Sequence, residues 1–451
     1  MKPLSPPSKW VAAALFSLLF FSGAAGLVYQ VVWFRVMHYS FGTTQLAITA
    51  VLAAYMVGMG LGSALAGKFV HRVRRPALIY ALLEGVIGVY ALAVTPLLYH
   101  VDYIFGLLGA NPSPAGATFF RLITAFLMFL VPTAAMGATL PVLSRALVTK
   151  KKAGGGSGRL YAVNTLGAVM GCLLAGFVTI RLVGLDGSLY LAAAGSLAVA
   201  ALSAALHFVA FGRRLAPKRA LETVDEGFHK TSAKDDDLAS TSPQRSADEP
   251  PRLSDQDTAP IKAVDPFSPK APGTFSLSVF AALMAALLGG ATALSNEVIW
   301  NRVLGMVLDG TVYGFSALLA AFLTGIALGS AILSPMVDKK PKKIWDILIA
   351  IYVLAGVGAV ITMVTIPMIP GLAGRFFKGG ISPYKGFLLK AVFVFFTILL
   401  PTLFYGAAFP ATVKLASRRL GPSQALARVY AANTAGSVVG VLMAGIILPA
   451  V

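Results

Sequence analysis

Eleven long apolar runs, joined mostly by short turns, constrain this chain more than any other feature of its sequence. Each run holds about the 20 apolar residues that an α-helix needs to cross the hydrocarbon core of a bilayer. Only 12% of the 451 residues are charged, whereas about a quarter of the residues in soluble domains are charged. A soluble globular protein is therefore excluded, and an all-α polytopic membrane protein is predicted. The expected membrane helices lie near residues 10–37, 44–70, 76–100, 117–147, 159–183, 187–211, 274–304, 311–335, 343–371, 384–416 and 424–451.

The net charge of +19 is concentrated in alternate turns between these runs. Two turns of the first half, 36–47 and 100–120, contain no lysine or arginine. By the positive-inside rule, the basic turns and the amino terminus lie in the cytoplasm. This confinement to short turns also argues against nucleic-acid binding, and one cysteine and five scattered histidines predict no metal site and no cofactor. The basic turns lie at 68–75, 145–159, 339–343 and 414–428, whereas Arg375, Lys378 and Lys385 form one exception on the expected outer side.

An internal repeat relates the two halves of the chain. The segment YQVVWFR at 29–35 matches NEVIWNR at 296–302, and AAYMVGMGLGS at 53–63 matches AAFLTGIALGS at 320–330, both at an offset of 267. Six predicted helices separate the copies, so both copies lie the same way up in the membrane. Two parallel six-helix repeats predict a major-facilitator-like bundle. Two further matches have an offset of 269: PTAAMG at 132–137 with PTLFYG at 401–406, and YAVNT at 161–165 with YAANT at 430–434.

The repeat divides the chain into three parts. Residues 1–212 form the first repeat, and residues 274–451 form a second repeat of about five helices, in which nothing matches the sixth helix of the first. We therefore expect a twelfth helix to follow Val451. The segment 213–273 is rich in Asp, Ser, Pro and Lys and poor in aromatic residues, which predicts a disordered cytoplasmic linker.

The repeated motifs resemble those of a known family. YQVVWFR at 29–35, PTAAMGATLP at 132–141 and LYAVNTLG at 160–167 are similar to the membrane part of bacterial fused spermidine-synthase-like proteins. The resemblance implies a bundle in the bacterial cytoplasmic membrane, a polyamine or related cation as substrate, and a synthase-like partner domain in cis or in trans. The synthase domain itself is missing from this chain, so no catalytic residue can be assigned. Three functions stay open: a transporter-like domain, a membrane anchor for an aminopropyltransferase, and a part of an enzyme that receives its substrate through the bundle.

Five polar residues within the apolar runs are candidates for substrate binding. Glu84 lies inside an apolar helix, where a charge costs about 2.5–3.5 kcal/mol, so it either takes part in transport or packs in a hydrogen-bonded form. Gln30 and Glu297 occupy equivalent positions in the two repeats. A substrate or gating cluster near the pseudo-symmetry axis is one interpretation of this pair. Asn164 and Asn433 are a second equivalent pair, for which interhelical hydrogen bonding is the simpler role.

Each copy of the first repeat motif also carries a tryptophan and an arginine, Trp33 with Arg35 and Trp300 with Arg302. Gating is one possible role for them. The favoured interpretation is an interfacial belt, with the indole rings at headgroup level and the arginines reaching outwards. The belt does not require an acid, so for Glu297 we favour a functional role.

Overall fold

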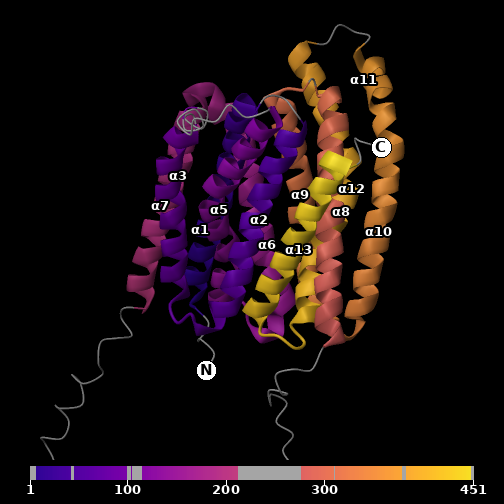
Figure 1. Ribbon diagram of the computed structural model, residues 1–451. Helices are drawn as coiled ribbons and strands as arrows, with labels where there is room; N and C mark the ends of the chain where they lie inside the picture. The colour runs from indigo at the N-terminus through magenta and orange to yellow at the C-terminus, as the bar shows by residue number, and fades with distance from the viewer. Residues whose placement is uncertain are drawn as a thin grey trace, which may run out of the picture. The chain divides into compact units, whose positions relative to one another are not determined.

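Every element in the described part of the computed structural model is helical (Figure 1). The structure describes residues 7–41, 45–98, 103, 114–211, 276–308, 310–377 and 382–447, so the predicted linker and Val451 lie outside the described residues. The first half contains α1 (Lys9–Phe41), α2 (Gln45–Phe69), α3 (Pro76–Leu98), α5 (Pro114–Leu147), α6 (Ala153–Leu173) and α7 (Ile180–Phe211). The second half contains α8 (Leu277–Val307), α9 (Val312–Lys339), α10 (Ile344–Thr365), α11 (Ile369–Phe377), α12 (Pro383–Ala416) and α13 (Pro422–Leu442).

Ten described segments are long and apolar enough to cross a membrane. One of them, Lys150–Ala210, has 61 residues, and a straight helix of that length would extend roughly 90 Å, about three times the bilayer core. Its backbone leaves the helical conformation at Gly184, where φ is 73°, a value that favours glycine because it has no Cβ. Both α6 and α7 pack against α1, so the chain reverses at Gly184 and the segment supplies two spans. The predicted all-α membrane fold is confirmed.

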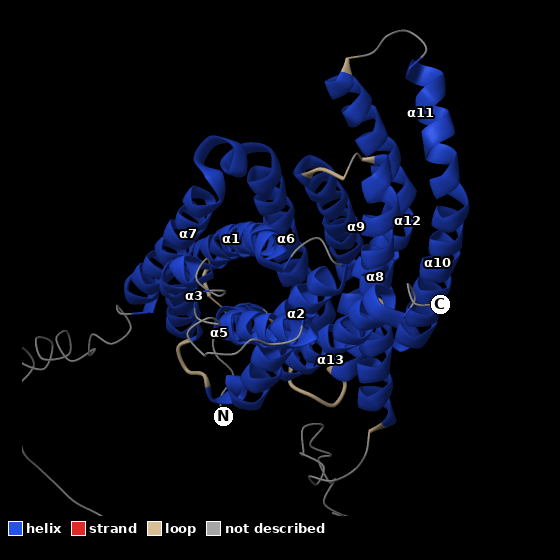
Figure 2. Cartoon of the chain, turned by 45° about the horizontal axis from the view of Figure 1, so that its top comes forward, coloured by secondary structure: helices blue, strands red, loops and turns tan. Residues whose placement is uncertain are grey.

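The helices of the two halves pack in the same pattern, as the repeat predicts. Helix α1 contacts α6 as α8 contacts α13, and α2 contacts α5 as α9 contacts α12. Between the halves, α2 packs on α13 and α6 packs on α9. Figures 1 and 2 show these four helices between α3 and α7 on one outer side and α10 on the other.

One pair of hydrogen bonds repeats this symmetry at atomic detail. Ser63 Oγ donates to the Ala427 carbonyl over 2.9 Å, and Ser330 Oγ donates to the Gly158 carbonyl over 3.0 Å. Ser63 and Ser330 are equivalent in the repeat, and so are Gly158 and Ala427. Both bonds cross between the halves near the basic turns, which places those turns of both halves at one end of the bundle and supports a parallel arrangement.

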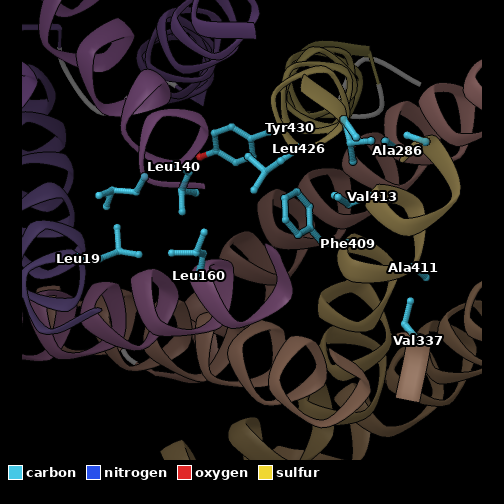
Figure 3. Close-up of a cluster of buried hydrophobic side chains, with 14 of the residues drawn as sticks. Leu19, Leu140, Leu160, Ala286, Val337, Phe409, Ala411, Val413, Leu426 and Tyr430 are labelled. Atoms are coloured by element: carbon cyan, nitrogen blue, oxygen red, sulfur yellow. The ribbon is translucent and has the colours of Figure 1, made fainter. Parts of the chain in front are cut away.

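A large buried apolar cluster joins the two halves (Figure 3). It brings Leu19, Leu140 and Leu160 of the first half together with Phe409 and Leu426 of the second. Many apolar side chains of α10, by contrast, are exposed, including Val353, Val360 and Met363. Apolar surface on the outside is expected where the solvent is lipid.

Candidate functional site

A cavity of about 170 Å³ lies between the two halves. Four of the five predicted substrate-binding residues line it, namely Gln30, Glu297, Asn164 and Asn433. Two pairs of equivalent positions from the two repeats therefore line the same cavity. The remaining wall includes Tyr161, Tyr430, Thr165 and Thr434 and the methionines Met56, Met59 and Met136.

The tyrosine and threonine pairs were not selected by the sequence analysis. They belong to the repeated YAVNT and YAANT segments, so the repeat itself was the signal that could have identified them. Tyr161 and Tyr430 meet edge to face, with ring centroids 6.5 Å apart. Hydroxyl, amide and thioether groups around one carboxylate form a mixed polar and apolar surface, which is typical of a site for a small organic molecule.

A second cavity of about 230 Å³ adjoins the first and shares Gln30, Tyr55 and Glu297 with it. Most of its other residues come from the second half of α1, the last turns of α8 and the beginning of α9, on the side of the bundle away from the basic turns, and Leu52 of α2 and Phe129 of α5 complete the wall. Both arginines of the repeat motif, Arg35 and Arg302, line this outer cavity. Within the described residues, the two cavities adjoin each other at Glu297.

The Glu297 side chain is buried, and its carboxylate has no hydrogen-bond or ion-pair partner among the described residues. Its side chain is 7% exposed, and within the described residues no hydrogen bond or ion pair to its carboxylate occurs. A buried carboxylate at membrane depth normally pairs with another group or faces a water-filled cavity. Because Glu297 faces both cavities, it can pair with a cation that enters from the outer end.

Glu84 is not brought together with the other four candidates. It is 1% exposed and lines neither cavity. Ser22 Oγ of α1 donates a hydrogen bond to its carboxylate, and the hydroxyl groups of Tyr80 and Ser196 are further neighbours. This environment connects α1, α3 and α7 within the first half and matches the packing interpretation better than a substrate contact.

We expect Glu84→Gln to preserve the stability of the bundle and Glu84→Leu to reduce it. The glutamine retains an oxygen that accepts from Ser22, whereas leucine leaves the half-buried Ser22 hydroxyl without this acceptor, at a cost of about 1–3 kcal/mol. Thermal unfolding in detergent measures the difference. A Glu84→Leu protein as stable as the parent would show that the hydrogen bond from Ser22 does not support the packing.

The belt interpretation of the two tryptophans is wrong. Trp33 is 1% exposed and Trp300 is 3% exposed, whereas a belt residue faces the lipid. The ring of Trp33 stacks between Tyr29 and Phe129 at centroid distances of 5.1 Å, and Trp300 packs against Phe322. The reason is that the faces of α1 and α8 that carry the tryptophans pack against neighbouring helices rather than against lipid. Hydropathy alone does not reveal which face of an apolar helix is buried.

The end with the basic turns is closed by polar contacts between the halves. Asp338 of α9 pairs with Lys414 of α12 at 2.7 Å and accepts a hydrogen bond of 2.8 Å from the backbone N–H of Gly155 at the start of α6. Lys414 also donates to the carbonyl of Lys151. Asp338 thus joins the second half to the first. Asp338 was not among the predicted site residues, although an acid next to a run of basic residues was a signal that could have identified it.

Comparisons with known proteins agree with this architecture. Residues 12–382 match the family model described as Major Facilitator Superfamily. A bacterial homologue of the iron transporter ferroportin, in an outward-facing state, is 15% identical, with a TM-score of 0.55 over 97% of this chain and 92% of that one.

Two other solved structures are similar over nearly the whole chain. The E. coli fucose:proton symporter FucP is 13% identical, with a TM-score of 0.50 and coverage of 97% and 92%. The nucleoside transporter NupG is 12% identical, with a TM-score of 0.50 and coverage of 97% and 90%. At these identities the likeness shows the fold alone, and no curated protein is similar enough to count as a relative. Because the family model covers most of the chain, this protein belongs to the Major Facilitator Superfamily.

Proposed function

We propose that this protein transports a small cationic metabolite through the central cavity, with Glu297 as the counter-charge. The observation that carries the proposal is the buried Glu297 carboxylate, which faces the cavity and has no partner in the described part of the chain. A carboxylate in this position attracts a cation because few other groups compensate its charge in a medium of low dielectric constant.

The two halves would carry the substrate by alternating access, in which one half rocks against the other around the cavity. The polar contacts at the basic end and the cavity on the opposite side support a state that is open on one side. We propose that the basic end faces the cytoplasm of a bacterium and that the amino terminus lies on the same side, as the positive-inside rule favours.

The repeated motifs resemble those of fused spermidine-synthase-like proteins, and this resemblance supports a polyamine as the transported cation. On the same ground we propose a synthase-like domain as partner, in cis or in trans. The resemblance also favours a second function, in which the bundle anchors an aminopropyltransferase to the membrane. An anchor does not need a cavity lined by polar side chains, so the site favours the transporter.

Uptake of labelled spermidine into proteoliposomes tests the proposal. The parent protein is expected to take up spermidine above empty vesicles, and Glu297→Gln is expected to reduce the initial rate at least tenfold, because it keeps the shape of the side chain and removes its charge. Asp346→Asn is the matched control, since Asp346 is an exposed acid in the first turn of α10.

Two results would contradict the transporter. Equal uptake by the parent and by a correctly inserted Glu297→Gln protein would exclude Glu297 as the counter-charge. No uptake by a folded parent, together with capture of an aminopropyltransferase by the membrane-bound protein, would favour the anchor instead.

A further inference from the structure

The outer cavity exposes two opposite charges that do not neutralise each other. Glu297 and Arg302 both line it, and both belong to α8. They are five residues apart, which is about 7.5 Å along a helix and about 140° around it. Arg302 forms no ion pair with any acid in the part of the chain that the structure describes.

Each of these groups selects a different part of a ligand. The Glu297 carboxylate is deep, at the junction of the two cavities, whereas Arg302 is more exposed and nearer the outer end of α8. A guanidinium group binds carboxylate or phosphate oxygens through two parallel N–H groups, with a strength that a neutral donor does not reach. A ligand with a cationic end and an anionic end can therefore satisfy both side chains at once.

A ligand with positive charge alone is less well matched to this cavity. The Arg302 guanidinium lies in the wall of the cavity that leads to Glu297. Like charges repel a second ammonium group at this depth, where the effective dielectric constant is lower than in water. An anionic group on the substrate converts that repulsion into attraction.

We propose that the substrate is zwitterionic, with an ammonium group that pairs with Glu297 and an oxyanion group that pairs with Arg302. The proposal rests on the proposed function, because it takes Glu297 as the cation site. It keeps Glu297 as the cation site but replaces the polyamine, which carries positive charge alone, with an amino-acid-like molecule in which a short chain separates the two charges.

Three ligands of similar length test this inference by calorimetric titration of the purified protein in lipid nanodiscs. Putrescine has two ammonium groups, γ-aminobutyrate has an ammonium and a carboxylate, and aminopropylphosphonate has an ammonium and a phosphonate. The parent is expected to bind at least one zwitterion at least tenfold more tightly than putrescine. The two zwitterions distinguish a carboxylate substrate from a phosphate-like one.

Variants of Arg302 connect this preference to the proposed contact. Arg302→Gln is expected to remove the preference for zwitterions and to leave the affinity for putrescine unchanged or higher, whereas Arg302→Lys retains part of the preference. Arg375→Gln is the control, because Arg375 is an exposed arginine in α11 of the same half and lines neither cavity. Thermal unfolding verifies that each variant is folded.

The outcomes separate the two proposals. If putrescine binds the folded parent as tightly as both zwitterions, or if Arg302→Gln leaves the ratio of affinities unchanged, the zwitterion is excluded while Glu297 can still bind a cation. If Glu297→Gln leaves all three affinities unchanged, the proposed function fails. If none of the three ligands binds the folded parent, the zwitterion proposal is also overturned, and the spermidine uptake decides the proposed function separately.

Discussion

Replacement of Gly62 by leucine is expected to prevent assembly of the first half of the bundle. A Cβ atom at Gly62 would overlap the backbone carbonyl of Ala134, where α2 and α5 cross. Overpacking usually costs about 1–3 kcal/mol when flexible side chains give way. Here the neighbour is backbone in the middle of a continuous helix, so the two helices must separate and lose their packing along the whole crossing.

The loss is measured as the yield of monodisperse protein after detergent extraction and as the unfolding temperature of any protein that remains. Gly329→Leu should have the same effect in the second half, since its Cβ would overlap the Leu403 carbonyl. Gly356→Leu is the matched control, because no atom lies within 4 Å of its Cβ position and leucine is a better helix former than glycine by up to about 1 kcal/mol. A Gly62→Leu protein as stable as this control would contradict the close crossing of α2 and α5.

Removal of the Asp338 carboxylate is expected to open the basic end of the bundle. In Asp338→Ala, the ammonium group of Lys414 and the N–H of Gly155 lose the acceptor that joins them. Hydrogen bonds to charged groups contribute about 1.5–3 kcal/mol, and the bond from Gly155 at the start of α6 joins the first half to Asp338 of the second. The equilibrium between the closed and open states of this end should therefore shift by roughly tenfold to a hundredfold.

A cysteine at position 63 reports this opening. Ser63 is fully buried between the halves near the basic end, and the native Cys172 can be replaced by alanine to leave a single thiol. The rate of thiol labelling at position 63 is expected to increase at least tenfold in Asp338→Ala and to remain unchanged in the control Asp346→Asn. Equal labelling rates in the parent and in Asp338→Ala would show that this contact does not hold the end closed.

The symmetric part of the site could be predicted from the sequence, because it follows from the repeat. Once Gln30 aligned with Glu297 and Asn164 with Asn433, a two-fold arrangement required the two members of each pair to lie at the same depth, and the packing of the helices turned both pairs towards the cavity. The asymmetric part could not be predicted in this way. Glu84 was a candidate on its charge alone, and only its neighbours in α1 and α7 distinguish a packing role from a substrate contact.

The sequence by itself determined the membrane location, the helices and the parallel repeat, because these depend on hydropathy, turn charge and periodicity within the chain. The tertiary structure decided which side chains share a cavity. Trp33 contacts Phe129, Asp338 contacts Lys414 and Gly155, and Glu297 and Arg35 face one outer cavity. These residues come from helices far apart in the sequence, and in a membrane both faces of a helix can be apolar. The direction in which a helix turns its polar residues is therefore set by packing against its neighbours rather than by contact with water.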